Sequence, residues 1–165
     1  MKRRSIASVL YAASPVLFLV LAALLLILYY TVPVPIRLPQ QCAFKIRTDS
    51  VGTGQWVEEP ETAETIHNAL EKLVCRRDLG RYDGLFPMPI EKDSYIVLEV
   101  YDANDIRNSF PNHCGDLVIW KDPRRGEYVG DYVLPSDNNR KKLSVLNDIT
   151  RIMELIEQYD YFDFS

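Results

Sequence analysis

Three cysteines and two histidines are the residues of this chain best suited to nucleophilic or metal chemistry. His113 directly precedes Cys114, and a thiol with a histidine base beside it can act as a nucleophile. Residues adjacent in sequence, however, rarely direct both side chains at one reacting atom. The sequence also lacks a close pair such as C-x2-C or H-x3-H, which zinc sites usually contain. We therefore predict no metal and no cofactor, and an enzyme using Cys114 and His113 is an alternative hypothesis.

The cysteines also raise the question of a disulfide, because an odd number permits one bridge and one leftover thiol. Cys75 falls at the end of a predicted helix and Cys114 in the loop before a predicted hairpin. A bridge between them closes a loop of about 40 residues, worth roughly 3–4 kcal/mol in the chain-entropy model. Cys42 lies on the buried face of a predicted strand, where a plain thiol is expected. A Cys75–Cys114 disulfide and three free thiols are both open interpretations.

Two further motifs resemble ligand-binding loops but lack the residues that such loops require. Residues 102–105 begin like a calcium loop, yet Ile106, Arg107 and His113 occupy the places of an acceptor, a glycine and a glutamate. Residues 52–54 lack the third glycine of a phosphate-binding loop. Without a catalytic motif, the sequence favours a binding protein over an enzyme.

The aromatic residues are more informative, with ten tyrosines and two tryptophans in the chain. Several alternate along predicted strands, so that they share the sheet face opposite the core. Exposed aromatic faces are common binding surfaces; in the competing interpretation, the loop 80–93 or the tail 159–164 covers this face. The predicted binding residues are Tyr95, Val97, Tyr101, Trp120 and Tyr132.

The N-terminal segment is predicted to be a membrane anchor. Residues 6–30 carry no charge, and about 20 helical residues cross a bilayer core of roughly 30 Å. Lys2, Arg3 and Arg4 precede this run and favour a cytoplasmic N-terminus. A cleaved signal peptide has an apolar region of about 7–15 residues before a small-residue cleavage site, whereas this run ends in Tyr-Tyr-Thr-Val-Pro-Val-Pro. Residues 1–30 are thus interpreted as a cytoplasmic stub and an uncleaved, single-pass signal anchor in the cell membrane.

The rest of the chain is predicted to form a stalk, a domain and a tail. Residues 31–41 contain three prolines, which favour an extended and fairly stiff stalk. Residues 42–159 are predicted to form an extracytoplasmic domain, and residues 160–165 an aromatic, acidic tail. The segment 37–165 holds 16 basic and 23 acidic residues, a net charge of −7, which argues against nucleic acid as the partner.

Hydrophobic periodicity predicts the elements of the domain. Strands follow from strict alternation, and helices from apolar residues spaced three and four apart. The order of elements predicts an α+β fold, a small two-layer sandwich with a mostly antiparallel sheet and two helices on one face. The expected elements are a strand at 42–48, a helix from Pro60 to Gly80, strands at 95–101 and near 106–110, a hairpin at 117–134 and a helix from 135 to about 159.

This layout resembles small membrane-tethered or secreted domains of uncharacterised Gram-positive bacterial proteins, over roughly residues 42–158. In those domains a short strand and a turn lead into a helix with an acidic start, and a meander and a last helix follow. The resemblance assigns no functional residue. The leading hypothesis is a bitopic membrane protein whose outside domain binds an envelope protein or a ligand. The alternatives are a thiol-dependent envelope enzyme and an accessory subunit of a membrane complex assembled through the transmembrane helix.

Overall fold

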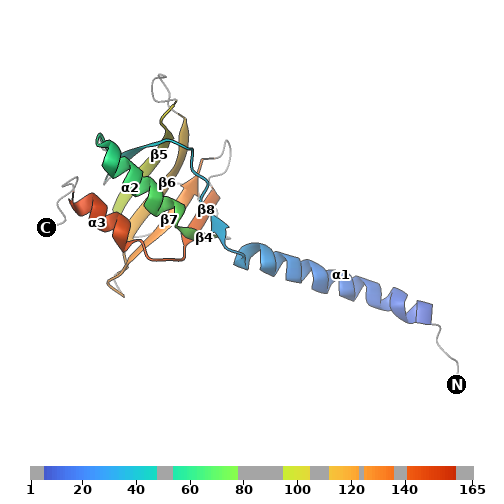
Figure 1. The fold of residues 1–165 in the computed structure, drawn as a ribbon. Coiled ribbons are helices and arrows are strands. Elements are labelled where there is room, and N and C mark those ends of the chain that lie inside the picture. Colours follow the sequence, from blue (N-terminus) through green and yellow to red (C-terminus); the bar gives the residue numbers. More distant parts are fainter. Residues whose placement is uncertain are drawn as a thin grey trace. The chain divides into compact units, whose positions relative to one another are not determined.

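The computed structural model describes the chain in six segments, without the side chains of residues 6–14 and Lys141. The chain divides into two compact units, Met1–Val32 and Pro33–Ser165. The first contains a single described helix, and the second contains all the described strands and two helices (Figure 1). The described segments are 6–47, 54–77, 95–104, 112–122, 125–135 and 141–158.

Helix α1 (Ile6–Thr31) belongs to the first unit and contains no charged residue. The four consecutive residues Val16–Leu19 are between 62% and 70% exposed. Because successive helical residues are about 100° apart, these four side chains cover the whole circumference of the helix. Among the described residues, no helix combines the length and the apolar character that crossing a bilayer requires.

The second unit is built on one sheet of eight strands, in the order β1-β4-β8-β7-β6-β5-β2-β3. Every neighbouring pair among these described strands is antiparallel. Strands β5 to β8 form a meander in the middle of the sheet, and the short strands β1 and β3 form its edges. The strands are β1 (Val34–Pro35), β2 (Cys42–Arg47), β3 (Gln55–Trp56), β4 (Val74–Arg77), β5 (Tyr95–Asp102), β6 (His113–Lys121), β7 (Tyr128–Leu134) and β8 (Lys141–Val145).

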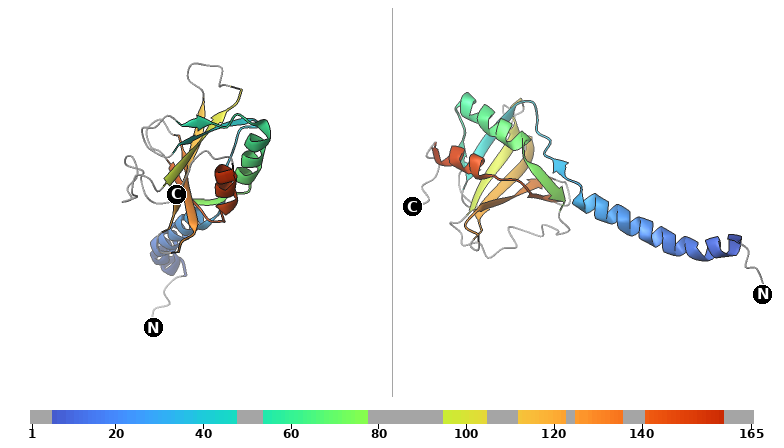
Figure 2. Two further views of the ribbon diagram at one scale, coloured as in Figure 1. Left: turned by 90° about the vertical axis from the view of Figure 1, so that its left-hand side faces the viewer. Right: turned by 60° about the horizontal axis from the view of Figure 1, so that its bottom comes forward.

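Helices α2 (Pro60–Glu71) and α3 (Thr150–Gln158) cover one face of this sheet (Figure 2). Ile66 and Leu70 of α2, with Ile152 and Ile156 of α3, are at most 1% exposed and pack with the sheet in the main core. The prediction of an α+β two-layer sandwich, with an antiparallel sheet and two helices on one face, is therefore confirmed for this unit.

The middle of the sheet follows the predicted alternation. Ile96, Leu98 and Val100 of β5 face the main core, as period-two patterning requires. Strands β6 and β7 form the predicted hairpin. Gly126 in its turn has a φ of 70°, a left-handed conformation that glycine adopts without steric cost.

The first predicted helix is too long. The sequence predicts a helix to Gly80, but α2 ends at Glu71 and the chain continues as strand β4. The side chain of Asn147 fixes this change of direction, because it accepts from the Val74 N–H at 2.8 Å and donates to the Lys72 carbonyl at 2.9 Å. Pairing of β4 with β1 and β8 therefore overrides the helical periodicity of the segment.

The last predicted helix begins too early. Residues 141–145 form strand β8, which lies between β4 and β7, and α3 begins only at Thr150. Leu143 points into the main core from this strand and is 6% exposed. Three further predictions fall outside the described residues, namely the loop at 80–93, the strand near 106–110 and the tail at 160–165.

The predicted stalk at 31–41 is largely part of the folded domain. Within it, strand β1 pairs with β4 at the edge of the sheet. Ile36 is 7% exposed and belongs to the main core. The carbonyl oxygen of Pro39 lies 3.1 Å from Nε2 of His67 in α2. The compact unit thus begins at residue 33 and not at residue 42, because the apolar residues between the prolines pack against the sheet.

Candidate functional site

The sheet face opposite α2 and α3, called the second face here, carries most of the predicted binding residues. Its centre is closed: Tyr95 is 6% exposed and Val97 is 1% exposed, and both pack with Val118 and Val133 in a small second core. Trp120 is partly buried and packs against the same cluster. The prediction of an open aromatic surface therefore does not hold for Tyr95, Val97 and Trp120, whose contacts contribute to the stability of the domain.

Tyr132 does not belong to the second face. It is fully buried in the main core, because β7 turns Asp131 and Val133 the other way. Its hydroxyl is buried without a hydrogen-bond partner. The ring packs against Gly115, where an added Cβ atom would come within 2.5 Å of the tyrosine oxygen. Glycine is therefore the residue that makes room for this side chain.

The exposed end of the second face is an aromatic cluster of Trp56, Tyr101 and His113, on strands β3, β5 and β6. The ring centroids of Trp56 and Tyr101 are 5.2 Å apart, and those of Tyr101 and His113 are also 5.2 Å apart. Trp56 is 38% exposed. The ammonium group of Lys45 lies 5.8 Å from the centroid of the Trp56 ring, within the range of a cation–π contact. Tyr101 is the predicted binding residue that belongs to this cluster.

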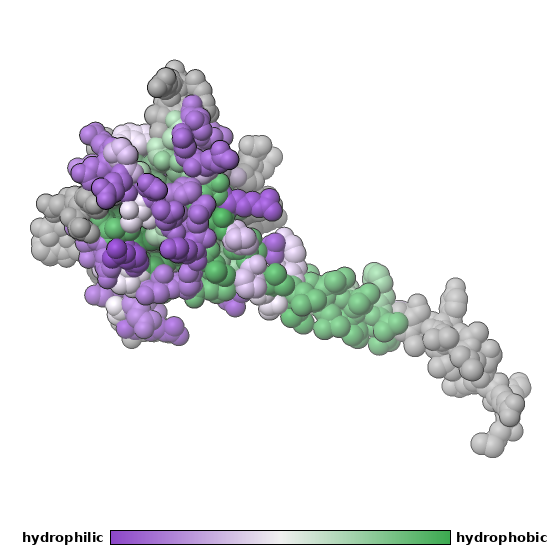
Figure 3. Space-filling view, viewed as in Figure 1, coloured by the Kyte–Doolittle hydropathy of each residue, from purple (hydrophilic) through white to green (hydrophobic). Residues whose placement is uncertain are grey.

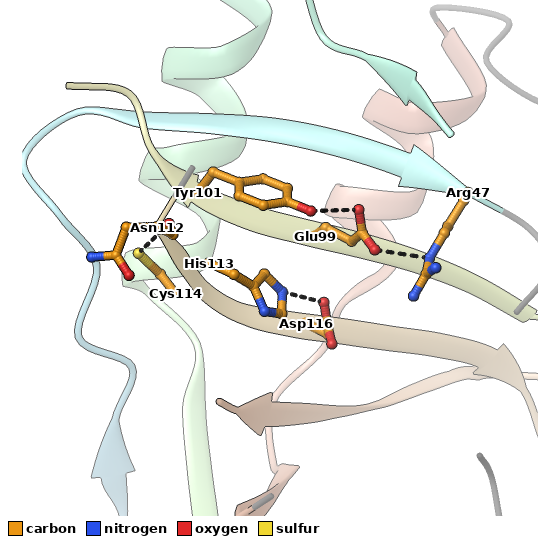
Figure 4. A network of polar contacts seen from close by, with 7 residues as sticks. All are labelled: Arg47, Glu99, Tyr101, Asn112, His113, Cys114 and Asp116. Atoms are coloured by element: carbon orange, nitrogen blue, oxygen red, sulfur yellow. Dashed lines mark hydrogen bonds and ion pairs between the residues drawn. The ribbon is translucent and has the colours of Figure 1, made fainter. Parts of the chain in front are cut away.

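Two buried carboxylates lie beside the aromatic cluster (Figure 4). Glu99 and Asp116 are 7% and 6% exposed and occupy directly opposite positions on β5 and β6. Like charges at such positions destabilise a sheet, and each acid has a basic partner. Nε of Arg47 lies 3.0 Å from Oε1 of Glu99, and Nε2 of His113 lies 2.7 Å from Oδ1 of Asp116. The Arg47 Nε–H is not aligned as a hydrogen bond, so this contact is an ion pair.

Tyr101 connects the aromatic cluster to these acids. Its hydroxyl donates a hydrogen bond to Oε2 of Glu99 at 2.9 Å. Burial raises the pKa of Tyr101, and the hydrogen bond to Glu99 raises it further. The phenol therefore stays protonated and continues to donate at neutral pH. Glu99 thus accepts from Tyr101 on one oxygen and faces Arg47 with the other.

A β-bulge brings His113 to this site. The register between β5 and β6 shifts between Val100 and Tyr101, so His113 lies opposite Tyr101, while Cys114 packs against the main core. The two neighbours therefore face opposite sides of the sheet, and the Cys114 thiol donates to the Asn112 carbonyl at 3.5 Å. Burial raises the pKa of Cys114, which is the reverse of what a nucleophilic thiol needs. This arrangement gives the Cys114–His113 enzyme alternative no support.

The three cysteines, Cys42, Cys75 and Cys114, are free thiols. Cys75 lies on β4 and Cys114 on β6, with two strands between them. Three strand spacings of about 4.8 Å place their Cα atoms about 14 Å apart, whereas a disulfide requires less than about 7 Å. The Cys75–Cys114 bridge considered from the sequence is therefore not formed. That pairing assumed a helix end at Cys75, where the chain forms a strand.

Sequence reasoning missed four residues of the site, namely Trp56, Arg47, Glu99 and Asp116. Trp56 lies in a two-residue strand, too short for a periodic signal. Alternation places Arg47 and Glu99 on the outer faces of their strands, but their pairing depends on the register between β2 and β5. That register is a long-range property, which a single sequence does not reveal.

A separate hollow of about 370 Å³ lies between α2 and α3, on the helical side of the sheet. Several of its polar lining residues already have partners within the chain. Asn147 bonds the backbone at the end of α2, and Arg151 contacts Glu154 at 3.1 Å. Within the six described segments, no group of three His, Cys, Asp or Glu side chains is placed to hold a metal ion.

The rim of the aromatic cluster is basic, because Lys45 lies over the Trp56 ring and because Arg47 and His113 are the partly exposed partners of the two buried acids. No family model matches the chain, and no curated protein or solved structure matches it. The geometry of this cluster and the composition of α1 therefore carry the functional argument.

Removal of the Arg47 guanidinium is expected to destabilise the domain. In Arg47→Met, Glu99 lies opposite Asp116 without its cation, and breaking a buried pair in this way costs about 3–5 kcal/mol when both partners are buried. Arg47 is 25% exposed, so we expect a loss of about 2 kcal/mol, measured by urea unfolding. Lys45→Met on the same strand is the control, with an expected change below about 0.5 kcal/mol. Equal losses in the two variants would refute the electrostatic explanation.

Alkaline pH is expected to destabilise the domain through two thiols, those of the buried Cys75 and the partly buried Cys42. Burial raises the pKa of Cys42 and that of Cys75 from 9.0 to about 12 each. The unfolded chain releases these protons from about pH 9, while the folded chain retains them. Titration of these two thiols therefore leaves the free energy of unfolding unchanged below about pH 9 and lowers it as the pH rises toward 12. Urea unfolding between pH 8 and 11 should show a shallower decline in Cys42→Ala and Cys75→Ala; an unchanged decline would exclude the thiols as its cause.

Proposed function

We propose that the chain is a single-pass membrane protein whose domain binds a protein partner outside the cytoplasm through the aromatic cluster. The observation that carries the anchor is the composition of α1. A helix that is apolar on every side is suited to a membrane or a large core. The sequence of α1 runs for 26 residues without a charge, although the described residues alone contain no helix long and apolar enough to cross a bilayer. At 1.5 Å per residue that length is about 39 Å, against a bilayer core of roughly 30 Å.

The surface contrast between the two units supports the same proposal. The described part of α1 is apolar, whereas much of the visible surface of the domain is hydrophilic (Figure 3). Lys2, Arg3 and Arg4 precede α1, and basic residues favour the cytoplasmic side of an anchor. The domain is accordingly proposed to lie outside the cytoplasm.

The composition of the aromatic cluster supports protein binding. Tryptophan, tyrosine and arginine dominate interface hot spots, and Trp56, Tyr101 and Arg47 lie together at one end of the second face. Glu99 holds Arg47 and Tyr101 in place before any partner arrives. Such preorganisation lowers the entropic cost of binding.

The charge of the rim indicates the chemistry of the partner. Lys45, Arg47 and His113 present basic groups around the rings, while the two acids beneath them are buried. Complementary potentials steer association and set specificity. We therefore propose that the partner presents an acidic segment with at least one apolar side chain for the Trp56 ring.

Photo-crosslinking in intact cells tests this proposal. A benzophenone amino acid replaces Trp56 in one variant and Glu64, an exposed residue of α2, in the matched control. We expect a discrete adduct from position 56 that is absent from position 64. Adding Lys45→Met, which removes a basic group beside the Trp56 ring and is expected to leave stability nearly unchanged, should weaken the adduct without changing the amount of protein in the membrane. Equal adducts at both positions, or none at position 56, would reject the aromatic cluster as the binding site.

A further inference from the structure

The edge of the sheet that begins with β1 lies one short connection away from α1. Helix α1 ends at Thr31 and strand β1 begins at Val34, so two residues join them. Three Cα–Cα steps of 3.8 Å span at most about 11 Å. Ile36 is buried in the main core, so the chain enters the domain without a free linker. This inference rests on the proposed membrane anchor.

The short connection limits how far β1 can lie from the bilayer surface when α1 spans the bilayer. The headgroup region of a bilayer adds about 10–15 Å in total to the hydrocarbon core, or about 5–8 Å on each side. If α1 spans the core, β1 starts within or just above the headgroups of the leaflet from which α1 emerges. Strand β4 is the neighbour of β1 in the sheet and lies about 4.8 Å from it.

This edge carries exposed apolar side chains in one cross-strand row. Pro35 of β1 lies opposite Val74 of β4, and the Leu146 N–H donates to the Val74 carbonyl at 2.8 Å. Val74 is 37% exposed and Leu146 is 49% exposed, and Pro35 is exposed as well. Pro35, Val74 and Leu146 thus form an apolar row that crosses β1, β4 and the residue after β8. The other large apolar residues of the domain are mostly buried.

The same edge is basic, although the chain beyond the anchor is acidic overall. Six basic residues and one acidic residue, Asp148, fall within the segments 34–38, 72–77 and 141–148. The segment 37–165 as a whole holds 16 basic and 23 acidic residues. Basic residues close to a membrane surface each contribute about 1 kcal/mol of attraction to anionic lipids. The six are Arg37, Lys72, Arg76, Arg77, Lys141 and Lys142.

We propose that this edge, called the membrane-facing edge, lies against the anionic headgroups of the bilayer that α1 enters. The apolar row of Pro35, Val74 and Leu146 inserts between headgroups, and Arg37 and Arg76, which are exposed basic residues of this edge, contact lipid phosphates. The aromatic cluster belongs to β3, β5 and β6, and β3 is the opposite edge of the sheet. Docking at β1 therefore holds the binding site away from the lipid.

Tryptophan quenching by brominated lipids tests this inference on the full chain. The variant Leu146→Trp is reconstituted in vesicles of phosphatidylcholine and phosphatidylglycerol with bromine near the headgroup end of the acyl chains. Helix α1 contains no tryptophan, and the two native ones are Trp56 and Trp120, so wild type supplies the baseline. We expect Leu146→Trp to be quenched several-fold more strongly than wild type. Glu64→Trp, on the exposed side of α2, is the matched control and should stay near the baseline.

The charge contribution is tested in the same vesicles. Arg37→Glu with Arg76→Glu should reduce the quenching of Leu146→Trp when phosphatidylglycerol is present, and should have little effect in phosphatidylcholine alone. Vesicle flotation after an alkaline wash separates the two proposals. A chain that floats without quenching at position 146 overturns the membrane-facing edge and leaves the anchor intact. A chain that does not float overturns the anchor, and the membrane-facing edge with it.

Discussion

Ile36→Asp is expected to unfold the domain. Ile36 is 7% exposed in the main core, and the variant places an unpaired carboxylate there. Such a charge costs more than about 4 kcal/mol, a large share of the 5–15 kcal/mol that stabilises a typical domain. Urea unfolding followed by tryptophan fluorescence should show the loss, because Trp56 and Trp120 both lie in the sheet.

Arg37→Asp is the matched control for this experiment. Arg37 is the next residue in the chain and is exposed, so its replacement is expected to change stability by less than about 0.5 kcal/mol. If Ile36→Asp were as stable as Arg37→Asp, residues 33–41 would be a free stalk after all. The same result would remove the short connection on which the membrane-facing edge depends.

Gly115→Ala is expected to cause the second large loss. The new Cβ atom would meet the Tyr132 oxygen at 2.5 Å and its Cζ at 2.6 Å. Tyr132 is fully buried and cannot move away, so overpacking should cost about 1–3 kcal/mol or more. Because Gly115 lies next to the bulge that positions His113, the change should also weaken crosslinking from position 56.

Two variants of Tyr132 show whether the steric explanation is right. Tyr132→Phe removes a hydroxyl that has no partner, so it is expected to leave stability unchanged or raise it by up to about 1 kcal/mol. Gly115→Ala should cost less in a Tyr132→Leu background than in wild type, since the ring is gone. An equal cost in both backgrounds would show that the backbone of β6, and not the tyrosine ring, requires glycine.

The sequence predicts the parts of the fold that have a long, regular pattern. Alternation in β5 and a helical apolar face in α2 are local properties, and both elements form, although α2 ends at Glu71, short of its predicted end. Strands β4 and β8 are four and five residues long and form because they pair with each other. Such pairing between distant segments overrides the local helical spacing, which is why both predicted helices include residues that belong to strands.

The candidate site is predictable only in part for a related reason. Alternation correctly groups Tyr95, Val97 and Tyr101 on one face of β5, but it does not show which end of that face is exposed. Tyr132 points from β7 into the main core, so its assignment to the second face is wrong. Its neighbours Asp131 and Val133 point to the second face instead. His113 reaches this face through a bulge, which a strict period of two does not anticipate.

Thiol labelling in intact cells tests the central claim, that α1 anchors a domain outside the cytoplasm. Glu64→Cys introduces an exposed thiol on α2, and Ser5→Cys introduces one before α1. The native thiols have a raised pKa through burial, so they form a weakly reactive background. A membrane-impermeant maleimide is predicted to label Glu64→Cys in intact cells and Ser5→Cys only after lysis. Labelling of Glu64→Cys only after lysis would contradict the proposed topology.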